Sequence, residues 1–144
     1  MMLRIQAHLR YGGDFELKVD HEWPLEGVTG LFGRSGCGKT TLLRLIAGLE
    51  RIRGAAVRFG DQHWQQGRQF VPLHRRRIGL VFQEHSLLPH LSVQENLLYG
   101  YKRTPARIRR LHLPEVSAML GIEDLLGRRI DQLSGGQRQR GSLG

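Results

Sequence analysis

The feature that most constrains this chain is a glycine-rich segment, Gly33-Arg34-Ser35-Gly36-Cys37-Gly38-Lys39-Thr40. It fits the pattern G-x-x-x-x-G-K-S/T, in which the backbone turns tightly and successive N–H groups face phosphate oxygens. Lys39 would bring a positive charge to the β- and γ-phosphates of a nucleotide, and the Thr40 hydroxyl could ligate Mg²⁺. We therefore interpret Gly33–Thr41, with Thr41 included, as a phosphate-binding loop.

The sequence around this loop has the setting that such a loop needs. The apolar run Val28–Phe32 precedes it and predicts a strand buried on both faces, as in a parallel sheet. A helix is predicted over Lys39–Ala47, with Gly48 ending it and with its positive dipole end at the loop. Cys37 is interpreted as a small filler, although a helix N-terminus can also lower the pKa of a thiol.

The N-terminal half is predicted to be rich in strands. Leu3–Leu9 and the alternating residues Phe15–Val19 predict two strands, joined by a hairpin turn at Tyr11-Gly12-Gly13. Further strands are predicted at Ala55–Phe59 and Ile78–Phe82.

The C-terminal half is predicted to be helical. Its helix boundaries are indicated by a capping box at Ser92-Val93-Gln94-Glu95 with an end near Gly100, by Pro114-Glu115 with an end at Gly121, and by a second capping box at Ser134-Gly135-Gly136-Gln137. This order predicts a β layer with a parallel core, followed by a helical subdomain.

A second motif that can bind an anion is Leu133-Ser134-Gly135-Gly136-Gln137. Ser134 and the two glycines would expose backbone N–H groups at the start of a helix, which favours negative charge. Two phosphate sites on one chain indicate a ligand shared between two chains.

With both motifs in place, the chain resembles the ATP-binding subunits of ABC transporters, whose LSGGQ signature stands intact here. The resemblance implies head-to-tail dimers, in which Ser134, Gly135 and Gly136 contact the γ-phosphate of ATP held by the partner chain. It also implies that Val81-Phe82-Gln83 is the Q-loop, where Gln83 would help to hold Mg²⁺. Tyr11 lies where the family places an aromatic ring on adenine; Phe15 is a competing choice, and packing in the hairpin is the alternative for Tyr11.

The resemblance implies an α/β fold: a P-loop NTPase core of ABC ATPase type, with an N-terminal antiparallel β layer and a helical subdomain. The expected division is residues 1–83 for the β layer and core and 84–140 for the helical subdomain. The implied cofactors are ATP and Mg²⁺, and the implied partner is an integral membrane permease subunit at the cytoplasmic face of the plasma membrane. The single cysteine fits a reducing compartment, and no continuous apolar run is long enough to span a bilayer.

Three segments narrow the resemblance to the ATP-binding subunits of molybdate importers: Phe32–Gly36, Pro72–Gly79 and Pro89–Gly100. In such importers the binding protein and the channel select the oxyanion, so no direct contact with the solute is expected here. Leu87-Leu88-Pro89 is a candidate docking spot for the permease, with local core packing as the alternative.

The family pattern stops after Arg140, where Gly141-Ser142-Leu143-Gly144 disfavours a continuing helix. No apolar strand ending in Asp-Glu follows the signature, so the Walker B aspartate, the catalytic glutamate and the switch histidine are absent from this sequence. Ala118–Asp124 imitates such a strand but precedes the signature, and Gly121 is a helix end. The resemblance implies an ABC-type ATPase that couples ATP binding and hydrolysis to solute uptake, present here as a truncated, poorly stable chain without these catalytic residues, and the sequence leaves open whether this chain alone hydrolyses ATP.

Two alternatives to an importer subunit remain open. One is a nucleotide-binding fragment without catalysis. The other is an ABC ATPase linked to nucleic acid, because the net charge is +9. The arginine clusters, including Arg75-Arg76-Arg77, are interpreted as a solvated face, and no aromatic residues are expected among them to stack on bases.

Overall fold

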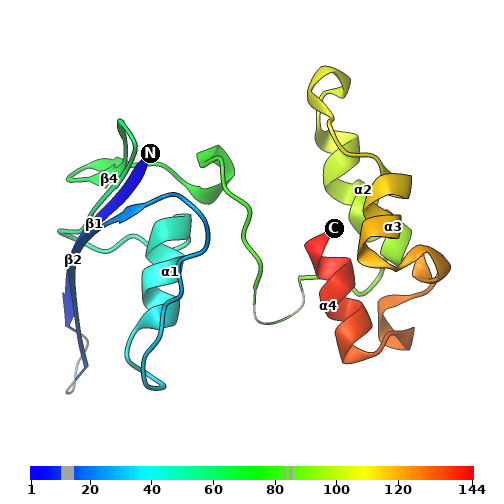
Figure 1. Cartoon of the computed structure of the whole chain (residues 1–144), viewed down its shortest axis with the longest axis horizontal. Coiled ribbons are helices and arrows are strands. Elements are labelled where there is room, and N and C mark those ends of the chain that lie inside the picture. The colour runs from blue at the N-terminus through cyan, green and yellow to red at the C-terminus, as the bar shows by residue number, and fades with distance from the viewer. Residues whose placement is uncertain (11–14, 83, 85) are drawn as a thin grey trace. The chain divides into compact units, whose positions relative to one another are not determined.

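The computed structural model describes residues 1–10, 15–82, 84 and 86–144. They form two compact units, Met1–Leu80 and Val81–Gly144 (Figure 1). The predicted hairpin turn at Tyr11-Gly12-Gly13 lies outside the described residues.

The first unit contains a five-stranded sheet with the strand order β2-β1-β3-β4-β5, in which every neighbouring pair is antiparallel. The strands are β1 (Met2–Arg10), β2 (Glu16–Pro24), β3 (Ala56–Phe59), β4 (Gln62–Gln66) and β5 (Gln69–Phe70). The prediction of the first two strands and of the third is confirmed. Alternation decides which face is buried: Ile5 and Ala7 are buried, whereas Gln6 and His8 are exposed.

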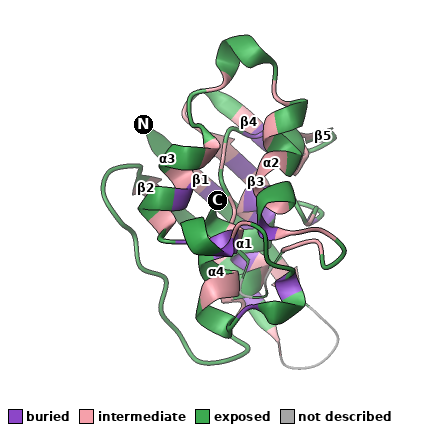
Figure 2. Cartoon of the chain, turned by 90° about the vertical axis from the view of Figure 1, so that its right-hand side faces the viewer, coloured by how far each residue is buried: buried purple, intermediate pink, exposed green. Residues whose placement is uncertain are grey.

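One helix covers the buried face of this sheet. The helix α1 (Lys39–Ala47) has the predicted bounds, and Gly48 ends it with φ of 74°. Leu42 and Leu45 pack with Ile5, Val57 and other buried residues into a single core (purple in Figure 2). Burial of each large aliphatic side chain contributes about 1.5–3 kcal/mol to folding, so this core fixes α1 on the sheet.

The predicted parallel core is wrong for the described residues. Neither Val28–Phe32 nor Ile78–Phe82 forms a strand, and Val28 and Phe32 are 98% and 93% exposed. A buried parallel strand needs a hydrogen-bonded neighbour on each side. The described strands β1–β5 pair only with one another, so they offer no such neighbour to either apolar run.

The second unit is helical, with α2 (Val93–Arg103), α3 (Leu113–Leu120) and α4 (Gly135–Leu143). The capping box predicted for α2 is confirmed: the Glu95 N–H donates to Ser92 Oγ at 3.2 Å, and the Ser92 N–H donates to Glu95 Oε2 at 2.8 Å. The helix ends at Arg103, past the predicted end near Gly100, because the Thr104 N–H still donates to the Gly100 carbonyl at 3.1 Å.

The other helices of this unit also agree with their predicted signals. Pro114 lies in the first turn of α3, and Gly121 ends the helix with φ of 59°. The rejection of Ala118–Asp124 as a strand is therefore confirmed. A second hydrophobic core packs Val93 of α2 with buried residues of the segment between α3 and α4, namely Ile122, Leu125, Ile130 and Leu133.

Candidate functional site

The glycine-rich loop leads directly into α1. Gly38 is the residue before the helix and has φ of 98°, in the left-handed region that favours glycine. A Cβ atom at Gly38 would lie 3.0 Å from Leu17 Cδ1 and 3.1 Å from Phe15 Cζ. A side chain at this position would therefore have to adopt the left-handed conformation and displace the ends of the Leu17 and Phe15 side chains, so glycine is favoured here.

Lys39 holds the loop together from inside. Its Nζ donates to the carbonyl oxygens of Gly33 and Arg34 at 2.8 Å each, and Cys37 Sγ lies 3.7 Å away. Cys37 is exposed. Within the described part of the chain, Lys39 has no carboxylate partner, so its charge is not neutralised.

The start of α1 offers free hydrogen-bond donors. No side chain caps the helix at Gly38, and its first turn contains no acidic residue. The first N–H groups of a helix have no partner inside the helix, and the dipole gives them a partial positive charge. Together with Lys39 and the exposed Thr40 hydroxyl, these donors fit the phosphates and the Mg²⁺ of a nucleotide.

The residues proposed to hold adenine and Mg²⁺ are only partly covered by the structure. Tyr11 and Gln83 lie outside the described residues. Phe15, the competing choice for adenine, lies beside the loop with its ring edge near Gly38. The geometry thus brings one aromatic ring to the phosphate-binding loop.

The signature motif starts α4 as predicted. The Gln137 N–H donates to Ser134 Oγ at 3.3 Å, and the Ser134 N–H donates to Gln137 Oε1 at 2.9 Å. Leu133 is 4% exposed and anchors the motif in the core of its unit. Gly135 and Gly136 are exposed, so the backbone at the helix start faces solvent.

The expectation that α4 would stop at the glycines after Arg140 is wrong. The helix continues to Leu143 because Gly141 is buried against Leu87, where a Cβ would be 3.5 Å from the Leu87 side chain. Leu87 therefore packs locally, and both backbone groups of Leu88 bond to the Asn96 side chain. Of the candidate docking spot, only Pro89 is exposed.

Arg76 is the residue that the sequence analysis misplaced. Arg75 and Arg77 are exposed as expected, but Arg76 is 4% exposed. Its Nε donates to the Val71 carbonyl at 2.7 Å, and its Nη1 donates to the Leu45 carbonyl at 2.9 Å and to that of Ile46. No local signal separates Arg76 from its two neighbours, which are also arginines.

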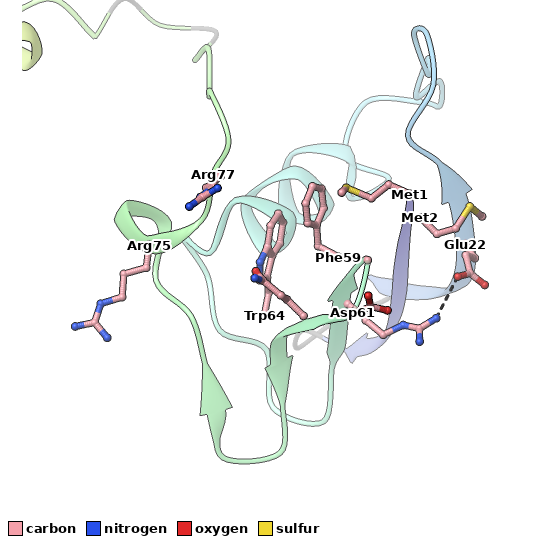
Figure 3. A pocket seen from close by; sticks show the side chains of 11 residues that line it. Met1, Met2, Glu22, Phe59, Asp61, Trp64, Arg75 and Arg77 are labelled. Carbon is pink, nitrogen blue, oxygen red and sulfur yellow. Dashed lines mark hydrogen bonds and ion pairs between the residues drawn. The ribbon is translucent and has the colours of Figure 1, made fainter. Parts of the chain in front are cut away.

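A cavity of about 760 Å³ lies elsewhere in the first unit (Figure 3). The rings of Phe59 and Trp64 stack beside it with centroids 4.4 Å apart. Arg58, which also lines it, pairs with Glu22 at 3.3 Å. None of its lining residues belongs to the phosphate-binding loop, so it is not the candidate site.

Comparison with known proteins decides the family. A sequence profile described as "ABC transporter" matches residues 18–144. The chain belongs to the ABC transporter family. The glycine-rich loop Gly33–Thr41 and the signature Leu133–Gln137 both lie in the matched region.

Among curated relatives of this ABC transporter chain, one is the molybdenum import ATP-binding protein ModC of Hahella chejuensis. It is 56% identical over 132 residues, which are 92% of this chain and 37% of the relative. The protein of the same name from Thiobacillus denitrificans is 53% identical over 138 residues, covering 96% and 38%. That of Rhodobacter capsulatus is 52% identical over 132 residues, covering 92% and 36%. The chain thus spans less than two fifths of these relatives.

A solved structure supports the fold. An ATP-binding cassette of an ABC transporter matches 99% of this chain and 62% of its own length, with a TM-score of 0.72 and 24% identity. Among the described residues, no helix has the length and apolar character needed to cross a bilayer.

Proposed function

We propose that this chain is the nucleotide-binding part of the ATP-binding subunit of a molybdate importer. The observation that carries the proposal is the loop before α1, where Lys39 bonds to backbone carbonyls and no side chain caps the start of the helix. Gly33–Thr41 bind the phosphates of ATP, and Thr40 and Gln83 hold Mg²⁺. Phe15 or Tyr11 contacts adenine, and the position of Phe15 beside Gly38 supports the former.

The signature motif acts on a second copy of the chain. Ser134, Gly135 and Gly136 contact the γ-phosphate held by the partner of a head-to-tail dimer. Exposure of both glycines at the start of α4 supports this role, since their N–H groups are accessible. The dimer meets an integral permease at the cytoplasmic face of the membrane, and ATP binding and hydrolysis by the intact subunit drive uptake.

A second candidate function concerns residues 1–144 taken alone. After the signature, the remaining residues 138–144 contain no Asp or Glu, so no carboxylate there can activate water. This observation favours nucleotide binding without hydrolysis. Turnover above background that Lys39→Ala abolishes would contradict it.

A chimera tests the importer function. Residues 1–144 replace the matching segment of the Hahella chejuensis relative, which is 56% identical, and molybdate uptake is measured in cells without their own importer. The chimera is expected to restore uptake, and Lys39→Ala is expected to abolish it. Arg53→Ala, at an exposed position, is the control. An expressed chimera that takes up molybdate equally well with Lys39→Ala would overturn the proposal.

A further inference from the structure

The connection between α2 and α3 is strongly basic. Between Asn96 and Pro114 the sequence contains no Asp or Glu. It contains five basic residues: Lys102, Arg103, Arg107, Arg109 and Arg110. This basic segment, residues 99–112, comprises the C-terminal part of α2 (Val93–Arg103) and the yellow loop that follows it in Figure 1.

Two of the arginines are held by tyrosine rings. The guanidinium of Arg103 lies 3.7 Å from the centroid of the Tyr99 ring, and its Nη1 donates to the Tyr99 carbonyl at 2.8 Å. Arg109 lies 4.4 Å from the Tyr101 centroid. Tyr99 and Tyr101 thus lie among the arginines of the segment, each with a guanidinium over its ring. These contacts order the base of the segment.

The other side chains of the basic segment have the exposure and charge that suit a binding partner. Lys102, Arg107 and Arg110 are exposed, and no ion pair involves them within the described residues. Next to Arg107 and Arg110 in the sequence are two exposed aliphatic side chains, Ile108 at 58% and Leu111 at 59%. The segment thus exposes positive charge and apolar side chains at neighbouring positions of the sequence.

We propose that the basic segment binds the anionic lipid surface of a membrane. Lysine and arginine are attracted to negatively charged headgroups, while aliphatic side chains gain by entering the boundary between headgroups and acyl chains. The occupant must satisfy both Arg107 with Arg110 and Ile108 with Leu111, and a lipid surface does so.

A nucleic acid fits the segment less well. Binding of single-stranded bases needs aromatic faces that are open for stacking. Arg103 lies over the Tyr99 ring and Arg109 over the Tyr101 ring. The exposed Ile108 and Leu111 add no contact that phosphates favour, so the segment lacks a base platform.

This lipid contact goes beyond the importer role proposed above. It gives the helical unit a direct contact with membrane lipids that is separate from any contact with a permease. The test below contains no nucleotide, so its result does not depend on whether the phosphate-binding loop binds ATP.

Vesicle binding tests the proposal on the full chain. Cosedimentation is measured with vesicles of phosphatidylcholine alone and with phosphatidylglycerol added. Binding is expected only with phosphatidylglycerol, and the double change Arg107→Gln/Arg110→Gln should weaken it on the order of tenfold. Arg53→Gln/Arg68→Gln, which removes the same charge from exposed positions of the first unit, should have little effect.

The apolar side chains separate insertion from charge attraction alone. Ile108→Ser/Leu111→Ser should weaken vesicle binding, whereas Met119→Ser, which is 76% exposed on α3, should not. Equal losses from the two arginine pairs would overturn the proposal, since binding would then follow net charge. It would equally be overturned if the serine pair had no effect and a DNA oligonucleotide bound through Arg107 and Arg110.

Discussion

Arg76 shows how one buried charge can fix the element that carries the phosphate-binding loop. Its guanidinium donates hydrogen bonds to the Leu45 and Ile46 carbonyls at the C-terminal end of α1 and to the Val71 carbonyl. Positive charge is favourable at a helix C-terminus. Burial lowers the pKa of Arg76 to about 10, so the group stays charged at neutral pH.

Removal of Arg76 should therefore destabilise the first unit. Arg76→Ala removes the guanidinium donor from the partly buried Val71 and Ile46 carbonyls, whereas the Leu45 carbonyl still accepts from the Gly48 N–H; an unsatisfied buried group costs about 1–3 kcal/mol. Thermal unfolding followed by circular dichroism should show a clear fall in Tm. Arg75→Ala is the matched control, because Arg75 is exposed and surface changes cost about 0.5 kcal/mol or less. Equal Tm values for the two variants would contradict this account.

Gly38 is the second residue whose replacement has a defined cost. Gly38→Ala must adopt φ of 98° and place its Cβ 3.0 Å from Leu17 Cδ1. The left-handed conformation alone costs about 1–2 kcal/mol for a residue with a Cβ. Chemical denaturation should show this loss, with Gly79→Ala as the control, since a Cβ there meets nothing within 4 Å. An unchanged denaturation midpoint for Gly38→Ala would contradict this prediction, because the loop would then accept a side chain at no cost in stability.

At the scale of elements, the features that depend on residues close together in the sequence were predicted well. The features that depend on residues far apart in the sequence were not. The starts of α2 and α4 follow from Ser92 and Ser134, whose capping partners are only three residues away. The strand β4 (Gln62–Gln66) was missed because four of its five residues are polar; Trp64, stacked on Phe59, anchors it. Val28–Phe32 was assigned wrongly because an apolar run does not specify its partner strands.

The capping box of α2 predicts acid sensitivity. Hydrogen bonds from the Ser92 backbone and side chain hold the pKa of Glu95 below its ordinary value. A carboxyl with a lowered folded-state pKa stabilises the fold above about pH 4.3, the ordinary pKa of Glu, and this contribution is lost as pH falls through the folded-state value. Helicity measured against pH should fall in that range, and Glu95→Gln should flatten the curve. Glu123→Gln should leave it unchanged; a curve equally steep in Glu95→Gln would refute the assignment.

The exposed run Val28–Phe32 makes the chain prone to association. Val28 and Phe32 are 98% and 93% exposed, and apolar surface of this kind favours contact with other molecules. Phe32→Ser should reduce both aggregation, measured by light scattering, and the binding of a hydrophobic dye. Its Tm should change little, since the ring is not in the core. An unchanged dye signal in Phe32→Ser would mean that the apolar surface responsible for association lies elsewhere.

At the scale of the whole molecule, the two anion-binding motifs belong to different units. The phosphate-binding loop lies in Met1–Leu80 and the signature in Val81–Gly144. Each has the backbone donors for phosphate, but only the loop adds a lysine whose charge is held among them. In the function proposed above, ATP binding by a single chain depends on the loop, and the signature acts when two chains meet.

The most direct test of this account is the binding of Mg²⁺–ATP to the 144-residue chain, measured by isothermal titration calorimetry at a concentration where the chain is monomeric. The account predicts saturable binding that Lys39→Ala abolishes and Ser134→Ala leaves intact. A folded chain that does not bind Mg²⁺–ATP, or that binds it equally well with Lys39→Ala, would contradict it.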